Sequence, residues 1–388
     1  MDIAIAGAGI GGLTAALALT RRGFAVEIYE RADKLEAAGA GIQLTPNALN
    51  VLFGLGLGPA LEAHMAVIEA VRIRKGATGG LIQQIPLDQC RQRWGAPYGV
   101  IHRADLQAVL VEAVRQHAIP LKLGQEIHAA RQDGRRAILS FTGGHTDVSA
   151  RILIGADGLW SKLRPLLGLE PPRFAGRRAW RAVIPSEDAP SLFQGLVTGL
   201  WLGDNAHFVH YPVRSGQALN LVAVTHDEDA GPGWSTPQPV QALLPHYAGW
   251  DGRLRALLAM VPQWRTWPLF EGRADSRIAT GNIALIGDAA HPMLPFIAQG
   301  GAAAIEDAAE LAARLDGAVD GDVPARLQVW SRLRLPRVTR IQTEARSNGE
   351  RYHWRWPLAA ARDLGLSALG GQRLLERYDW LYGWKPTE

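Results

Sequence analysis

The sequence is poor in cysteine, in long apolar runs and in blocks of like charge. Cys90 is the only cysteine among 388 residues, so no disulfide can form within the chain and an oxidising compartment is not required. No uninterrupted apolar run approaches the roughly 18 residues of a membrane span, and no basic segment precedes an apolar stretch at the N-terminus. These absences favour a cytoplasmic protein without a membrane segment.

Charge of one sign is not concentrated anywhere along the chain. The formal net charge is +4 and the pI is near 9.4, but the sequence has no long block of like charges. A nucleic-acid-binding face is therefore not indicated. A modest positive field would suit an anionic substrate, whereas a solvated basic surface is the simpler interpretation.

Length and composition indicate a folded protein of about two domains. The 388 residues exceed what one compact core usually holds. Apolar residues make up 47% and charged residues 20% of the chain, which is typical of a globular protein rather than a disordered one.

The first thirty residues carry the strongest pattern. A strand leads directly into a G-x-G-x-x-G turn, and a helix and a second strand follow before a single carboxylate. In chain order these elements are residues 2–6, Gly7 to Gly12, residues 13–22, residues 25–29 and Glu30. The first glycine of such a turn permits its tightness, the second lets a pyrophosphate approach the backbone, and the third lets the helix pack on the strand.

Glu30 completes a dinucleotide-binding pattern. It lies eighteen residues after Gly12, where a carboxylate accepts hydrogen bonds from ribose hydroxyls and repels a 2′-phosphate. Glycine turns also arise for packing alone, but here every element agrees. The pattern predicts a dinucleotide site without deciding between FAD and NAD.

Two later predicted strands also end in glycine and aspartate residues that could face a ligand. Residues 147–154 end in Gly155-Ala156-Asp157-Gly158, which can be a ligand-facing turn or a simple β-turn. Residues 282–286 end in Gly287-Asp288, and a helix predicted over residues 302–315 follows the Gly300-Gly301 pair. A strand-end aspartate can reach a sugar hydroxyl, and a glycine-rich helix start offers free N–H groups. His291 has no second His or Cys at ligand spacing, so no metal is predicted.

Shorter signals precede these motifs. Residues 37–48 are rich in small side chains, which could lie against a flat ligand or form an ordinary connecting loop. Arg103 is predicted to open a helix, where a cation opposes the helix dipole unless an anion lies nearby.

The strand predicted over residues 206–212 carries the candidate catalytic pair. Period-two alternation places His207 and Tyr211 on one face and His210 on the other. A His and a Tyr on one face could form a proton-transfer pair if that face lines a pocket, although an isolated strand histidine is often structural.

With these residues in view, the chain resembles the class A FAD-dependent aromatic hydroxylases. The three motifs at Gly7 to Glu30, Gly155 to Gly158 and Gly287 to His291 occur in the order and rough spacing of that family's FAD fingerprints. Tyr211-Pro212 and the tail Asp379 to Trp384 look most like the salicylate hydroxylase and 3-hydroxybenzoate 6-hydroxylase branch. The likeness covers nearly the whole chain.

The resemblance implies an α/β fold. A Rossmann-type, glutathione reductase-like FAD-binding domain is expected from residues 1–65, 98–175 and 271–340. An inserted mixed β-sheet substrate domain is expected from residues 66–97 and 176–270, and a C-terminal helical segment from residues 341–388. A monomer or homodimer is expected.

The resemblance also implies the chemistry and the residues that carry it. FAD would take hydride from NADH or NADPH, form a C4a-hydroperoxide with O2 and hydroxylate a small phenolic, benzoate-, pyridine- or quinolone-like ring. His207 and Tyr211 match a His-x-x-x-Tyr-Pro pattern whose members face substrate in relatives. FAD contacts are implied for Gly7, Gly9, Ile10, Gly12, Glu30, Arg31, Gly41, Ile42, Arg103, Ile127, Asp157, Asp288, Pro295, Gln299, Gly300, Gly301 and Ala302.

The expected substrate pocket includes Gln43 and Phe296. Relatives often have a Gln or His near positions 295 and 296, so Pro295-Phe296 predicts a more apolar pocket. Two other functions agree with the same flavin motifs: a flavin oxidase or dehydrogenase without oxygen insertion, and a flavin-binding protein that acts through interaction.

Overall fold

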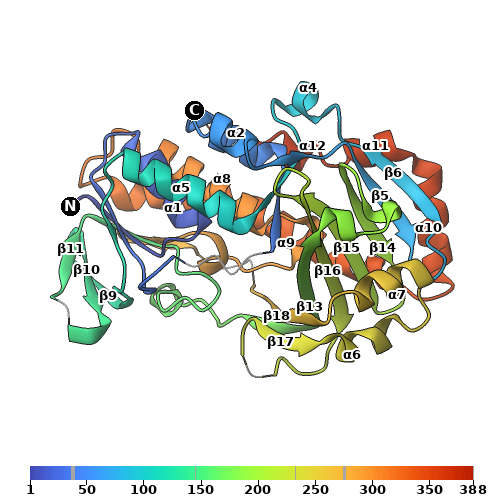
Figure 1. Cartoon of the computed structure of the whole chain (residues 1–388). Coiled ribbons are helices and arrows are strands. Elements are labelled where there is room, and N and C mark those ends of the chain that lie inside the picture. Colours follow the sequence, from blue (N-terminus) through green and yellow to red (C-terminus); the bar gives the residue numbers. More distant parts are fainter. Residues whose placement is uncertain (36–39, 145, 232, 274–276, 388) are drawn as a thin grey trace.

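The chain forms two regions joined along a long helix, as shown by the computed structural model (Figure 1). The structure describes residues 1–35, 40–144, 146–231, 233–273 and 277–387. Part of the predicted small-residue segment, Ala37 to Gly39, lies outside the described residues.

A six-stranded sheet forms the core of the first region. Its order is β19-β20-β12-β1-β2-β8, and all neighbours are parallel except β19 and β20. Strand β1 is entirely buried, as expected for a strand covered on both faces. The strands are β1 (Ile3–Ala6), β2 (Val26–Tyr29), β8 (Leu121–Lys122), β12 (Ile152–Gly155), β19 (Ala279–Thr280) and β20 (Ile283–Leu285).

Helices cover this sheet. Helix α1 packs against both α5 and α8, and α2 packs against α8. Helix α1 is buried over most of its length because its small residues let neighbouring helices approach closely. The helices are α1 (Ile10–Thr20), α2 (Pro46–Gly54), α3 (Gly58–Glu62), α4 (Cys90–Trp94), α5 (Arg103–Gln116) and α8 (Gly300–Leu315).

Two small sheets adjoin the first region. The predicted meander is an antiparallel sheet of order β11-β10-β9, which lies at the far left of Figure 1. A second sheet has the order β3-β7-β4, and both of its strand pairs are antiparallel. The strands are β3 (Gly41–Leu44), β4 (Ala66–Val67), β7 (Gly99–His102), β9 (Ile127–Asp133), β10 (Arg136–Phe141) and β11 (Val148–Ala150).

The second region is built on an eight-stranded mixed sheet of order β17-β18-β13-β16-β15-β14-β5-β6. Strand β14 pairs in parallel with β5, so a segment far back in the sequence completes this sheet. The strands are β5 (Ala70–Lys75), β6 (Leu81–Pro86), β13 (Arg173–Pro185), β14 (Val197–Leu202), β15 (Ala206–Val213), β16 (Ala218–His226), β17 (Thr236–Pro239) and β18 (Gln263–Glu271). Helices α6 (Val240–Leu243) and α7 (Gly252–Ala259) lie beside it.

The C-terminal helices close the second region. Helix α9 (Val323–Tyr352) runs from α8 toward the large sheet, and α10 (Leu358–Leu369) and α11 (Gly371–Glu376) pack on β6 (Figure 1). Helix α12 (Asp379–Tyr382) ends the tail. Because α9 continues without interruption through residue 340, the predicted boundary there does not coincide with the end of an element. The α/β class with a parallel sheet and a mixed sheet is confirmed.

Candidate active site

The glycine turn between β1 and α1 has the geometry of a phosphate-binding loop. A Cβ on Gly7 would lie 2.4 Å from the Ala156 carbonyl oxygen, and a Cβ on Gly12 would lie 2.0 Å from that of Gly7. Both glycines are therefore required by packing. A Cβ on Gly9 would meet no atom within 4 Å, so the space beside this residue is open to a ligand.

One cleft brings together many of the predicted FAD contacts. Its volume is about 230 Å³, and it lies where β1, β2 and β12 end. Predicted contacts that line this cleft are Gly7, Gly9, Glu30, Arg31, Arg103, Ile127 and Asp157. Ile10 and Gly12 follow in the first turn of α1.

Glu30 is held at the end of β2 by backbone donors. Its carboxylate accepts hydrogen bonds from the amides of Ala8 (2.8 Å) and Ala32 (3.0 Å). These contacts position the carboxylate beside the glycine turn, where the pattern places a ribose.

The second motif also faces the cleft. The Lys162 amide donates to Asp157 Oδ2 at 2.8 Å, whereas Asp157 Oδ1 is buried without a hydrogen-bond partner among the described residues. Burial raises the pKa of Asp157. A ligand hydroxyl or amide donating to Oδ1 would satisfy this atom, so the residue fits a bound cofactor.

Buried polar contacts connect the third motif, Gly287 to His291, to helices α8 and α9. The buried Asp307 carboxylate contacts the Gly287 amide (2.9 Å), His291 Nε2 (2.6 Å) and Arg334 Nε (2.7 Å). His291 is thus explained by an ion-pairing network, and the described residues contain no cluster of His, Cys, Asp and Glu that could hold a metal. Asp288 is solvent-accessible at the end of this turn. Desolvation by the protein atoms around its carboxyl raises the pKa of that group.

The start of α8 offers backbone rather than side chains. A Cβ on Gly300 would come no closer than 4.0 Å to Met293, which leaves room for a ligand. Gly301 abuts Ile42, and Ala302 is buried. The Gln299 side chain donates to Thr45 Oγ1 and accepts from the Asn47 side chain, both at 3.0 Å. Only the backbone of Gln299 is therefore available to FAD.

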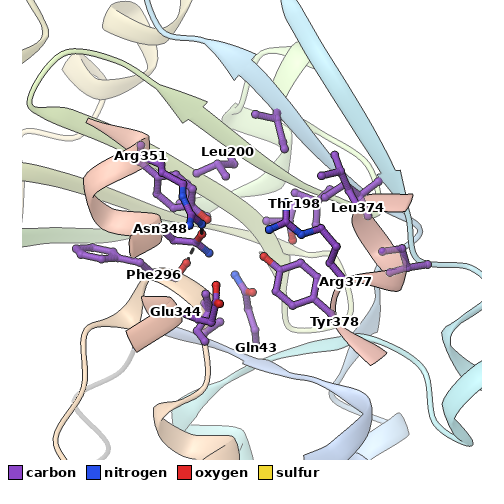
Figure 2. A pocket seen from close by; sticks show the side chains of 18 of the residues that line it. Gln43, Thr198, Leu200, Phe296, Glu344, Asn348, Arg351, Leu374, Arg377 and Tyr378 are labelled. Atoms are coloured by element: carbon purple, nitrogen blue, oxygen red, sulfur yellow. Dashed lines mark hydrogen bonds between the residues drawn. The ribbon is translucent and has the colours of Figure 1, made fainter. Parts of the chain in front are cut away.

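A larger cavity lies between the mixed sheet and the C-terminal helices (Figure 2). Its volume is about 520 Å³, and the predicted pocket residues Gln43 and Phe296 both line it, together with Pro295. Tyr98 donates a hydrogen bond to the Gln43 side chain. Aliphatic residues of β5, β6 and β14 form much of its wall.

His207 lines this cavity and His210 does not, as the strand period predicts. The His207 ring lies 5.2 Å from that of Phe296, measured between centroids. His210 turns to the opposite face, where its ring stacks near Phe208 and Phe193. A Cβ on Gly199 would lie 1.9 Å from His210 Nε2, so the glycine makes room for this ring. Burial lowers the pKa of each histidine to about 3.

The predicted pairing of His207 with Tyr211 is not what the geometry shows. Tyr211 shares the face of His207, but its hydroxyl donates to the Gly41 carbonyl oxygen at 2.7 Å and its ring occupies the space beside Gly41. Burial raises its pKa. His207 Nδ1 instead lies 2.7 Å from Nε2 of His353, at the end of α9. Tyr211 thus braces β3 against β15.

Sequence reasoning missed the contributions of the C-terminal helices. His353 contacts the cavity residue His207 from the end of α9, and four arginines of the C-terminal region line the cavity itself. The arginines are Arg340, Arg351, Arg362 and Arg377. The expectation of a more apolar pocket therefore holds for the sheet side only.

The cleft and the cavity together define a redox enzyme that holds a dinucleotide beside a chamber for a small substrate. Residues 1–345 match the FAD binding domain family, and the chain belongs to that family. It is a FAD-dependent monooxygenase of the class A aromatic hydroxylase type, so the predicted resemblance is confirmed.

Relatives match over almost their full length. The chain is 36% identical to the 3-amino-4-hydroxybenzoate 2-monooxygenase PtnB3 of Streptomyces platensis, covering 99% of this chain and 96% of that protein. It is 34% identical to 3-hydroxybenzoate 6-hydroxylase 1 of Aquipseudomonas alcaligenes, covering 100% and 98%. Klebsiella pneumoniae HpxO, solved with FAD and uric acid, has a TM-score of 0.87 at 27% identity, covering 98% and 96%.

When bound, FAD supplies electron transfer and the activation of oxygen. The residues present fit it: Gly9 and Gly300 leave open space at the two helix starts, and Asp157 Oδ1 is a buried acceptor without a partner among the described residues. The first turns of α1 and α8 offer N–H donors, and Glu30 and Asp288 offer carboxylates.

Proposed function

We propose that the protein hydroxylates a small aromatic acid, using NADH or NADPH and O2, in the cavity beneath the C-terminal helices. The observation that supports this proposal is the charge of the cavity wall, where four arginines are accompanied by one glutamate, Glu344, as the carboxylate lining the space. Figure 2 shows the polar ends of Gln43, Glu344 and Tyr378 directed into the same space. The named relatives above act on hydroxybenzoates, which are aromatic acids.

Two of the four arginines are engaged by other parts of the protein, which leaves Arg351 and Arg377 to bind an anion. Arg362 donates to the carbonyl oxygens of Arg351 (2.8 Å) and Tyr352 (3.1 Å) and pairs with Asp363. Arg340 lies 3.8 Å above the Trp380 ring.

Arg351 makes one side-chain contact, to Asn348 Oδ1 at 3.3 Å, and Arg377 makes no ion pair within the described residues. Both arginines line the same cavity as Tyr378, whose pKa is raised by burial, and their positive charges oppose that rise. We assign the substrate carboxylate to Arg351 and Arg377.

His207 lines the same cavity and packs against the ring of Phe296. With its pKa near 3 it is neutral at pH 7 and can accept a proton from a ring hydroxyl or orient that hydroxyl. Tyr211 supports the site by holding Gly41 and the neighbouring Ile42 and Gln43 in place.

The proposal is tested with 3-hydroxybenzoate, 3-amino-4-hydroxybenzoate and 6-hydroxynicotinate, each beside its amide. Binding is followed by the change in flavin absorbance, and products are identified by mass. A charge-assisted contact of about 1.5–3 kcal/mol predicts that acids bind roughly 10- to 100-fold more tightly than amides.

Arg351→Gln and Arg377→Gln should each remove most of the preference for acids over amides. The matched control is Arg373→Gln. Arg373 is an exposed residue of α11, the helix whose Leu374 and Leu375 line the cavity, and its replacement should leave the preference unchanged. Equal binding of acids and amides in the unmodified protein would contradict the assignment. NAD(P)H oxidation without a hydroxylated product would instead indicate an oxidase or dehydrogenase.

Two observations bear on the cellular setting. None of the helices within the described residues is long and apolar enough to cross a membrane. The buried Cys90 thiol has its pKa raised to about 12 by burial, so it stays protonated. We propose a cytoplasmic enzyme that acts as a monomer or homodimer.

A further inference from the structure

His207 and His353 form a hydrogen-bonded pair of buried imidazoles. His207 Nδ1 lies 2.7 Å from His353 Nε2, and their ring centroids are 4.9 Å apart. Both side chains are buried, at 3% and 6% exposure. Since Nδ1 of His207 is engaged by His353, Nε2 is the nitrogen left for the cavity that His207 lines.

The surroundings keep this pair neutral. Burial lowers the pKa of both rings, and the positive charge of Arg177 lowers both further. Beyond burial, the pKa of His353 is lowered by His207 on β15, Arg177 on β13, Arg362 on α10 and His226 on β16, and Arg362 is itself paired with Asp363. Tyr352 packs beside His207. No carboxylate of the described residues pairs with either imidazole, so neither ring is expected to store a proton as imidazolium at neutral pH.

A neutral pair holds one proton between its two facing nitrogens, and this gives it two tautomeric states. In the first state His207 donates from Nδ1, its Nε2 can accept from the cavity, and His353 carries its proton on Nδ1. In the second state His353 donates from Nε2, and His207 presents an N–H to the cavity. His353 Nδ1 is buried without a partner among the described residues, so this atom is the open end of the pair.

We propose that His207 and His353 relay a proton from the substrate hydroxyl to the side of the sheet where His226 lies. This inference rests on the proposed function, because it requires an aromatic substrate with an ionisable ring hydroxyl. The substrate O–H bond breaks as its proton joins His207 Nε2, the Nδ1 proton of His207 moves to His353 Nε2, and the Nδ1 proton of His353 leaves to solvent. The substrate becomes a phenolate, and both imidazoles remain neutral.

This transfer of a proton from His207 to His353 explains how His207, with a pKa near 3, can act as a base at neutral pH. A single buried imidazole would have to become a cation beside Arg177, whereas two coupled rings exchange one proton for another. His353 Nδ1 is buried, whereas His226, which is paired with Arg177 across β13 and β16, is solvent-exposed, so the relay is proposed to end on this side of the sheet. His353 is therefore a positioning residue that completes the action of His207.

The first test needs no substrate. Nitrogen-15 NMR of the FAD-loaded protein should show both rings neutral from pH 5 to 8, with one proton shared between them. Titration of either ring as an imidazolium in that range would overturn the proposal.

The second test measures proton release with a pH indicator in stopped flow when 3-hydroxybenzoate binds, and again with 3-methoxybenzoate, which has no ring proton to lose. His353→Phe should slow release roughly 10- to 100-fold, with unchanged FAD content and unchanged 3-methoxybenzoate affinity. His353→Gln keeps a hydrogen bond to His207 but cannot pass a proton, so it should be equally slow.

The matched control is His210→Phe, a buried histidine of the same strand that faces away from the cavity, and its release rate should be normal. Normal release in His353→Gln would show that the contact only orients His207, and the relay would be wrong. Failure of every aromatic acid to bind the unmodified protein would count against the proposed function, while the NMR result would still decide the state of the pair.

Discussion

At the scale of single residues, the site is governed by which face of a strand a side chain occupies. His207 and His210 differ by three positions on β15 and both have a pKa near 3, yet one lines a cavity and the other fills a core. The two residues therefore form an internal comparison for catalysis.

His207→Ala should lose roughly 10²–10⁴ in the hydroxylation step, which is the usual contribution of a positioned acid or base, with flavin content unchanged. His210→Phe should hydroxylate normally in whatever protein folds. The measurement is hydroxylated product against hydrogen peroxide in a single turnover. If His210→Phe uncouples the reaction and His207→Ala does not, the assignment of the two faces is wrong.

The buried histidines also set a direction for acid stability. His210 has a folded pKa near 3 and an ordinary unfolded value near 6.5. Between these values the unfolded chain binds the proton and the folded one does not, so stability is lost as the pH falls from about 6.5 toward 3. His210→Phe should flatten this decline in urea midpoints measured from pH 7.5 to 4. An unchanged slope would show that His210 does not contribute.

Asp288 is the residue with the sharpest cofactor prediction. Asp288→Ala removes an exposed carboxylate beside the FAD-binding turns, and loss of one charge-assisted hydrogen bond should weaken FAD retention by roughly 1.5–3 kcal/mol. FAD affinity is measured by titration of the apoprotein, with thermal unfolding of the apoprotein as the control for folding. An unchanged affinity would remove Asp288 from the site.

At the scale of elements, helix α9 connects the cofactor motif to the cavity. Near its middle Arg334 pairs with Glu306 (2.9 Å) and Asp307 (2.7 Å) of α8, all three being buried. At its end His353 meets β15. One helix therefore supports the Gly287-Asp288 turn through Asp307 and the proposed base through His353.

Arg334→Met should leave the buried Asp307 without its arginine, whereas Glu306 keeps its contacts with Arg337, and breaking one buried ion pair typically costs about 3–5 kcal/mol. The matched control is Arg326→Met on the same helix, whose pair with Asp322 is partly exposed and should contribute under about 1 kcal/mol. Urea unfolding of both variants separates the two cases. FAD retention should fall only in Arg334→Met, because Asp307 also orders Gly287.

At the scale of the whole molecule, the cofactor cleft and the substrate cavity belong to different regions that meet along β3 and residues 295–297. Without an aromatic acid in the cavity, reduction of the flavin by NAD(P)H should be slow, because a flavin reduced without a target would waste the reductant as hydrogen peroxide. Stopped-flow reduction with and without a bound acid checks this expectation. Equal rates would contradict it.

The parts of this architecture that the sequence predicts are those carried by local patterns. Gly7 to Gly12, Glu30 and the period of β15 are read from neighbouring residues, and the structure places them as expected. His353 and Arg377 could not be predicted, because their role arises from the packing of the C-terminal helices on strands far back in the sequence, 146 residues away for the contact of His353 with His207. Tyr211 had the right face, but its hydroxyl bond to Gly41 depends on β3, which local pattern does not position.

The packing of α10 and α11 on β6 also sets an order of events during synthesis. Ser367 donates a hydrogen bond to the Ile82 carbonyl oxygen across 285 residues of chain, and a Cβ on Gly371 would lie 2.0 Å from the carbonyl oxygen of Gln84. At a ribosomal rate of about 5–20 residues per second, β6 emerges roughly 15 to 60 s before these partners do. For that interval the edge of the large sheet is uncovered and open to nascent-chain chaperones. All three FAD motifs and the start of α8 are also made before α10 and α11, so the cofactor-binding turns are complete before the chamber for a substrate is closed.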